Sequence, residues 1–94
     1  MSGDVACYVV NIQFEDQTLT EINELSNHLT RAGFSLTLKD EQGKVHDLGT
    51  NTFGLTGTQD ANTVKELAHG LAQIAVGRSV EVEVVTFEQW LKDQ

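Results

Sequence analysis

The 94-residue sequence predicts an α+β fold with the element order βαββαβ. Three observations predict it: four short runs of β-branched and aromatic residues that alternate with polar ones, two helical stripes that begin at capping residues, and the order of these segments. This order is that of the ferredoxin-like split βαβ arrangement. Right-handed crossovers then give an antiparallel four-stranded sheet in the order 4-1-3-2, with both helices on one face.

The four strands are expected at residues 5–14, 34–39, 51–56 and 80–84, and a turn at residues 40–43 follows the second. Residues 44–50 show no clear pattern. Alternation assigns two faces to the sheet. The helix-covered face is expected to hold Tyr8, Val10, Ile12, Phe14, Phe34, Leu36, Leu38, Phe53, Leu55, Val80, Val82 and Val84. The open face is expected to hold Cys7, Val9, Asn11, Gln13, Ser35, Thr37, Lys39, Thr52, Gly54, Thr56, Glu81 and Glu83.

Both helices have clear start and stop signals. Thr18 and Glu21 form the spacing of a capping box, and Gly33 ends the first helix. Asp60 or Thr63 can cap the second helix, which ends at Gly77. A short amphipathic tail follows at residues 87–91, in which Trp90 is expected to anchor the tail or to dock a partner. The stripes are Leu19, Ile22, Leu25, Leu29 and Ala32 in the first helix, and Ala61, Val64, Leu67, Ala68, Leu71, Ile74 and Ala75 in the second.

Length and composition narrow the class of protein. The length suits a single domain, residues 1–94. Six Lys and Arg against 14 Asp and Glu give a net charge of −8, which disfavours a general nucleic-acid binder and an anionic membrane surface as partner. Cys7 is the single cysteine, so neither an internal disulfide nor a thiolate zinc site is expected. Without an apolar run of about 18 residues or a basic leader, the expected location is the cytoplasm.

The residues alone leave the chemistry open. His28 and His46 are candidate general acids or bases because imidazole titrates near neutral pH, while solvent-exposed histidine is the simpler interpretation. Glu15 and Asp16 end the first strand, and such carboxylate pairs can bind Mg²⁺, although loops favour acidic residues for local reasons too. No histidine has the spacing of a metal site, so no resident metal is expected.

A more specific pattern runs through the whole chain. The sequence resembles the type V antitoxin family GhoS, in which a Tyr-Val-Val first strand, an acidic turn ending in Gly and an Asn-x-Phe third strand follow at fixed spacing. The matching residues here are Tyr8-Val9-Val10, Phe34, Asp40-Glu41-Gln42-Gly43, Leu48, Asn51-Thr52-Phe53 and the ending Thr86-Phe87-Glu88-Gln89-Trp90.

The resemblance implies a ferredoxin-like endoribonuclease, similar to CRISPR-associated endoribonuclease-like proteins, that cleaves the messenger RNA of a small membrane toxin. Cleavage would use His28 or His46 as the base, or Mg²⁺ held by Glu15 and Asp16. The residues expected to contact RNA are Arg31, Lys39 and Lys44. A homodimer is expected through the tail or the last strand, by analogy with related nucleases and because edge strands invite pairing. The alternative is a non-catalytic, dimeric interaction module with the same fold.

Overall fold

β1 (Ala6–Gln13) lies at the centre of a three-stranded antiparallel sheet, between β4 (Thr52–Gly57) and β5 (Glu81–Thr86). The computed structural model describes residues 5–93. Within these residues, β2 (Thr37–Lys39) and β3 (Val45–Asp47) form a separate two-stranded hairpin. The helices are α1 (Leu19–Arg31), α2 (Ala61–Val76) and α3 (Phe87–Lys92).

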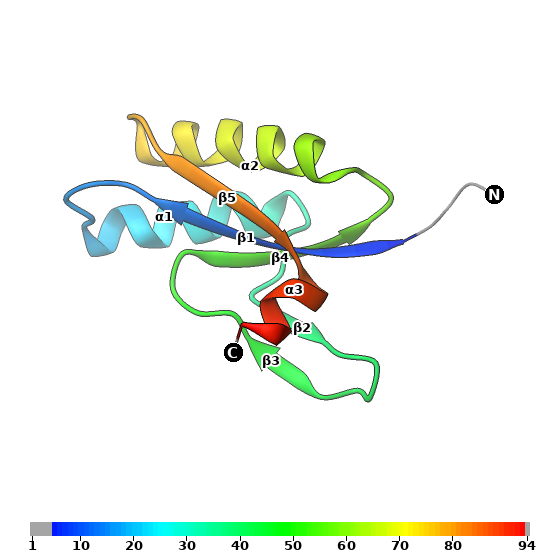
Figure 1. Ribbon diagram of the computed structural model, residues 1–94. Helices are drawn as coiled ribbons and strands as arrows, with labels where there is room; N and C mark the ends of the chain where they lie inside the picture. The colour runs from blue at the N-terminus through cyan, green and yellow to red at the C-terminus, as the bar shows by residue number, and fades with distance from the viewer. Residues whose placement is uncertain (1–4, 94) are drawn as a thin grey trace.

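The main core lies between the sheet and the helices α1 and α2, which cover the same face (Figure 1). β1 supplies the alternating residues predicted for this face, since Tyr8, Val10, Ile12 and Phe14 are all buried in it. The helices add Leu25 and Leu29 from α1 and Val64, Ala68 and Ala72 from α2. Three small or medium residues on α2 allow this helix to approach the sheet closely.

The predicted four-stranded sheet is wrong. Residues 34–39 do not run alongside β4 as one strand: Ser35 makes a single bridge to Gly54, and the chain then turns away to form β2. β2 pairs with β3, which lies in the segment 44–50 where the sequence pattern was unreadable. β3 has only three residues, of which Val45 and Asp47 are exposed, so it carries no alternation of buried and exposed residues long enough to recognise.

Leu38 explains why the hairpin leaves the sheet. Gly54 has no side chain, and Leu38 occupies the space above it, with its Cγ 2.5 Å from where a Cβ of Gly54 would lie. Leu38 therefore packs on the face opposite the helices, and the expectation that Leu36 and Leu38 belong to the helix-covered core is wrong. Leu36 is 52% exposed. β2 crosses over the sheet at this point because a glycine lets another segment approach its backbone closely.

A second, smaller core covers part of the face that was expected to be open. It consists of Val9, Leu38, Leu48 and Phe87, with Cys7, Val85, Trp90 and Leu91 packed against it. The hairpin and α3 thus lie together on one side of the sheet, and α1 and α2 lie on the other (Figure 1). The prediction that Trp90 anchors the tail agrees with this packing.

Capping decides the ends of the helices as predicted. The Thr18 hydroxyl accepts a hydrogen bond from the Glu21 backbone N–H and the Glu21 carboxylate accepts one from the Thr18 N–H, which is a complete capping box. Asp60, rather than Thr63, caps α2, and Gly77 ends it in the left-handed conformation at φ 80°. The apolar stripes are narrower than expected, however, because Leu19 and Ile74 are 75% and 73% exposed. Within residues 5–93, no helix has the length and apolar character needed to cross a membrane.

Candidate functional site

The hairpin of β2 and β3 holds a hydrogen-bonded pair of side chains that could act in acid–base chemistry, His46 and Asp40. His46 lies on β3 opposite Leu38 of β2, and its Nε2 is 3.0 Å from Oδ2 of Asp40 in the turn. The other carboxylate oxygen of Asp40 accepts hydrogen bonds from the backbone N–H groups of Gln42 and Lys44, both at 2.9 Å. The turn therefore holds the carboxylate in place, and the carboxylate orients the imidazole.

The charge state of Asp40 determines the tautomer of His46. The hydrogen bond from His46 is the largest cause that lowers the pKa of Asp40 below 3.8, and the Lys44 backbone N–H lowers this pKa further. At neutral pH Asp40 is therefore a carboxylate, which can only accept hydrogen bonds. Nε2 of His46 must then carry the proton, and Nδ1 of the neutral ring is left with the lone pair that a general base needs.

Two aromatic rings of α3 lie against the imidazole. The ring of His46 meets Phe87 edge to face at 5.8 Å between centroids, and it meets Trp90 in the same way at 6.1 Å. Phe87 and Trp90 are themselves stacked at 5.9 Å. The side chains of His46 and Asp40 are still 20% and 19% exposed, so solvent or a ligand reaches this pair. Packing against flat rings leaves the imidazole few alternative orientations.

Lys39 and Lys44, two of the residues expected to contact RNA, lie next to Asp40 and near His46 in the sequence of the same hairpin. Lys39 lies opposite Val45 in the hairpin register, Lys44 follows the turn, and both side chains are exposed. Lys39 and Asp40 also line a hollow between the beginning of β1, the hairpin turn and α3, together with Cys7 and Phe87. The hairpin thus gathers a histidine, a carboxylate and two ammonium groups within eight residues of sequence.

The other candidate residues lie elsewhere. His28 is on α1, in the helix layer on the opposite side of the sheet, where its Nδ1 pairs with the Glu24 carbonyl oxygen at 2.9 Å. Arg31 is exposed in the last turn of the same helix. Among residues 5–93, no hydrogen bond or ion pair joins His28 to His46, so the fold separates the two histidines that the sequence nominated.

Glu15 and Asp16 lie in the loop after β1, and Arg78 holds their backbone rather than their carboxylates. The Arg78 guanidinium donates to the carbonyl oxygens of Glu15 and Asp16 and to the Glu21 carboxylate at 3.1 Å. Asp16 adopts a positive φ of 53° there. Over the described part of the chain, no group of three or more His, Cys, Asp or Glu side chains is placed to hold a metal ion. Among residues 5–93, the two carboxylates thus have no third protein ligand of these types beside them.

Asp40 as the partner of His46 was not predicted. The sequence indicated Asp40 only as a turn residue beside Glu41. A separation of six residues from His46 predicts no contact unless the two residues lie in one hairpin. Asp40-x-x-Gly43 followed by His46 is the signal that would have found the pair, once a strand at residues 45–47 is assumed.

Comparison with known proteins places the whole chain in one family. The family model described as "Endoribonuclease GhoS" matches residues 1–93. Two curated relatives, both described as "Uncharacterized protein YdiZ" and coming from Escherichia coli K12 and O157:H7, are each 51% identical to this chain over 89 residues. The match covers 95% of this chain and 93% of each relative. With this agreement along almost its full length, the chain belongs to the GhoS endoribonuclease family.

Proposed function

We propose that this chain is an endoribonuclease antitoxin that acts in the cytoplasm on the messenger RNA of a small membrane toxin. The family match over residues 1–93 supports the reaction class. The observation that carries the proposal for the site is the His46–Asp40 pair at 3.0 Å, with exposed Lys39 and Lys44 on the same hairpin. Ammonium groups on the same hairpin as an oriented imidazole would attract the phosphodiester backbone of RNA toward that base.

The proposed reaction is an attack of the ribose 2′-hydroxyl on the adjacent phosphorus. Nδ1 of His46 accepts the 2′-hydroxyl proton while Asp40 keeps the proton on Nε2. The new P–O bond forms a 2′,3′-cyclic phosphate, the bond to the 5′-oxygen breaks, and the leaving oxygen takes up a proton from solvent water to become a 5′-hydroxyl. Lys39 and Lys44 stabilise the negative charge that develops on the phosphate oxygens.

The experiment is cleavage of a toxin messenger RNA fragment by purified wild-type and variant proteins. His46→Gln should reduce the rate by about 100-fold or more, the usual contribution of a general base. Asp40→Asn should reduce it by a smaller factor, because the imidazole stays but loses its carboxylate partner. His28→Gln is the matched comparison, since it removes an imidazole from the helix layer and should leave the rate unchanged.

Chemical controls separate the two mechanisms that the sequence allowed. A 2′-deoxyribose at the cleavage position should stop the reaction, and EDTA should not. Loss of cleavage with EDTA and with Asp16→Asn, together with full activity of His46→Gln, would contradict the role of His46 and favour Mg²⁺ at Glu15 and Asp16 instead. Activity that survives all of these changes would point to a contaminating nuclease.

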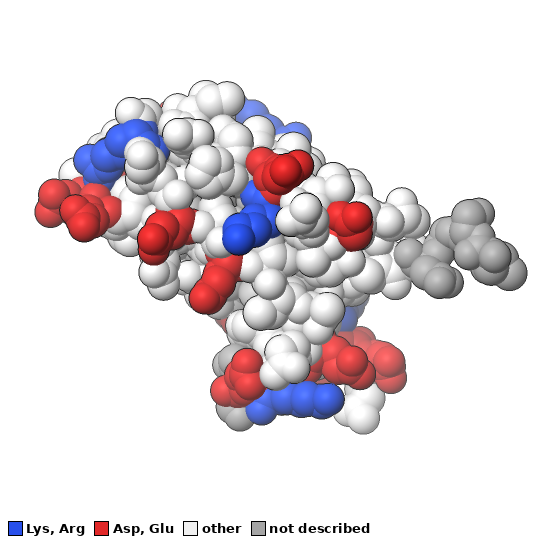
Figure 2. All heavy atoms as spheres, turned by 45° about the horizontal axis from the view of Figure 1, so that its top comes forward, with Lys and Arg blue, Asp and Glu red and all other residues white. Residues whose placement is uncertain are grey.

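A non-catalytic interaction module is the second candidate, and the charge of the chain favours it. Fourteen acidic residues outnumber six basic ones. On the face seen in Figure 2, Asp and Glu side chains are interspersed between the Lys and Arg side chains of the described residues. Such a surface attracts a polyanion weakly. Absence of cleavage by the wild-type protein, with the fold intact by circular dichroism, would favour this function.

A further inference from the structure

β5 is an edge strand with one free side. It pairs with β1 along Glu81–Thr86, and β1 is its only partner among the strands of residues 5–93. In an antiparallel pair, every second residue directs its backbone N–H and C=O away from the partner strand. β5 therefore presents a row of backbone donors and acceptors that another strand can pair with.

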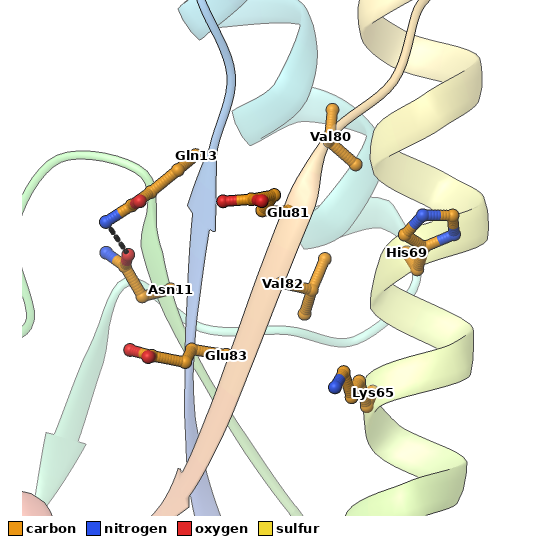
Figure 3. A pocket seen from close by; sticks show the side chains of 8 residues that line it. All are labelled: Asn11, Gln13, Lys65, His69, Val80, Glu81, Val82 and Glu83. Carbon is orange, nitrogen blue, oxygen red and sulfur yellow. Dashed lines mark hydrogen bonds between the residues drawn. The ribbon is translucent and has the colours of Figure 1, made fainter.

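The side chains along this edge differ sharply between the two faces of the sheet. The register places Glu81 opposite Gln13 and Glu83 opposite Asn11. Figure 3 shows the carboxylates of Glu81 and Glu83 on the same side as the two amides, and Val80 and Val82 turned toward α2. These residues line one pocket with Lys65 and His69 of α2. The edge is thus acidic on the open face. On the helix side it is apolar, with Lys65 and His69 of α2 beside it.

A second copy of the chain is poorly suited to this edge. Opposite residues of antiparallel strands have their side chains on the same face, and like charges directly opposite are destabilising. If two β5 strands paired with Val82 opposite Val82, Glu81 of one copy would face Glu83 of the other. If they paired with Glu83 opposite Glu83, the two Glu83 side chains would face each other. With both helix layers then on the same side of the joined sheet, Lys65 would also approach its equivalent. In these two registers the charges oppose self-pairing, and a strand of the opposite sign suits the edge better.

We propose that the free edge of β5 binds an extended peptide segment of a partner protein by strand addition, and that the segment alternates cationic and apolar residues. Lys or Arg side chains on the open face would pair with Glu81 and Glu83, and apolar side chains on the other face would contact Val82 beside α2. Lys65 disfavours a cationic side chain on the helix side. The peptide is therefore expected to bind with its cationic residues on the open face and its apolar residues on the helix side. This binding function is separate from RNA cleavage and does not depend on it.

Three groups of synthetic six-residue peptides test the proposal, measured by fluorescence anisotropy with the full chain. A peptide of alternating Lys and Val should bind, with an affinity that falls as salt is added, and a peptide of alternating Glu and Val should not. The third group contains two versions of the Lys-Val peptide. In one version the backbone nitrogens of the Lys residues carry methyl groups, and in the other those of the Val residues do. One of these two versions should lose binding and the other should keep it, because one set of N–H groups pairs with β5.

Variants of the chain provide the matched test. Glu81→Gln with Glu83→Gln should weaken binding of the Lys-Val peptide about 2- to 30-fold, the range for two exposed ion pairs. Glu24→Gln with Glu41→Gln makes the same change in net charge away from Glu81 and Glu83 and should leave the affinity nearly unchanged. Glu81→Lys with Glu83→Lys should reverse the preference toward the Glu-Val peptide. Circular dichroism of each variant verifies that it is folded.

Several results would overturn the proposal. Equal loss of binding in the control pair would mean that net charge alone attracts the peptide. Binding that both N-methylated peptides retain would exclude strand addition. Hydrogen exchange that slows along β5 as the concentration of the peptide-free chain increases would show that a second copy occupies the edge instead.

Discussion

Asp40 gives the candidate site its geometry, and its ionisation should be visible in the stability of the hairpin. Its carboxylate accepts bonds from His46 and from two backbone N–H groups of the turn, so one side chain organises both the turn and the imidazole. A protonated Asp40 would lose acceptor capacity on one of these oxygens. The site therefore depends on a single carboxylate remaining ionised.

Asp40→Asn should destabilise the protein at neutral pH more than at acidic pH. The pKa of Asp40 is lowered in the folded state, so its contribution is fully present above the unfolded value of 3.8 and is lost as the pH falls through the folded pKa. Urea unfolding of the wild type and Asp40→Asn at pH 7 and near pH 3 measures this. A difference in unfolding free energy that is the same at both pH values would contradict the assignment.

Asn51 is buried and has a left-handed backbone conformation, which gives a structural reason for Asn in the Asn-x-Phe pattern. Its φ is 59°, it is 8% exposed, and its Nδ2 donates to Oε1 of Gln17 at 3.0 Å. Gln17 in turn donates to the Phe14 carbonyl oxygen, which defines the orientation of both amides. The Asn51 side-chain oxygen is buried and accepts no hydrogen bond from the described residues. Asn is suited to this position because it tolerates the left-handed conformation.

Two substitutions at Asn51 should separate the backbone effect from the hydrogen bond. Asn51→Gly and Asn51→Ala both remove the bond to Gln17, but only alanine has a Cβ that opposes a positive φ. Asn51→Ala should therefore be less stable than Asn51→Gly by about 1–2 kcal/mol in urea unfolding. Equal stabilities would mean that the loop rearranges to a negative φ when the amide is lost.

At the scale of elements, the contact of Leu38 with Gly54 decides where the hairpin goes. Gly54 of β4 faces Val9 of β1, and Leu38 of β2 packs on top of it in the second core. Phe87 and Trp90 of α3 complete the same core and contact His46. The position of the candidate site therefore depends on a glycine that lies in a different element.

Gly54→Ala should displace the hairpin. The added Cβ would lie 2.5 to 2.9 Å from three carbons of Leu38, so Leu38 must move, at a cost of about 1–3 kcal/mol. Gly70→Ala is the matched control, because nothing lies within 4 Å of its Cβ in α2 and the change should stabilise the helix by about 0.5–1 kcal/mol. We expect Gly54→Ala to alter the near-ultraviolet signal of Trp90 and Gly70→Ala to preserve it. A Gly54→Ala protein as stable as the wild type would contradict the packing of Leu38.

At the scale of the whole molecule, the homodimer expected from the sequence stays a prediction. The tail, one of the two surfaces proposed for it, has another role in the structure: Phe87 is buried, and Trp90 and Leu91 pack against the second core of the same chain. Glu81 and Glu83 oppose pairing of β5 with its own copy. Light scattering at about 100 μM tests the dimer. A mass twice that of the chain would confirm it, and the mass of one chain would contradict it. We expect any dimer to leave the edge of β5 free, so Glu81→Lys with Glu83→Lys should not change the mass.

Local signals in the sequence determined the parts of the fold that need no distant partner. The β1 alternation from Tyr8 to Phe14, the capping box of Thr18 and Glu21, and the glycine end of α2 were all predictable, because residues within a few positions of one another produce them. The family was equally accessible, since turn and core residues at fixed spacing carry the resemblance.

Only the tertiary structure decided the path of residues 34–50 and the composition of the candidate site. The alternation of Phe34, Leu36 and Leu38 predicts one shared buried side, but the structure places Phe34 in the main core and Leu38 in the second core, and leaves Leu36 exposed. Here the absent side chain of Gly54 offers Leu38 a place on the far side of the sheet. This contact separates β2 from β4, allows β3 to form, and brings His46 to Asp40 and to the rings of α3. Contacts between elements distant in the sequence select among several locally acceptable paths, and no local pattern records that choice.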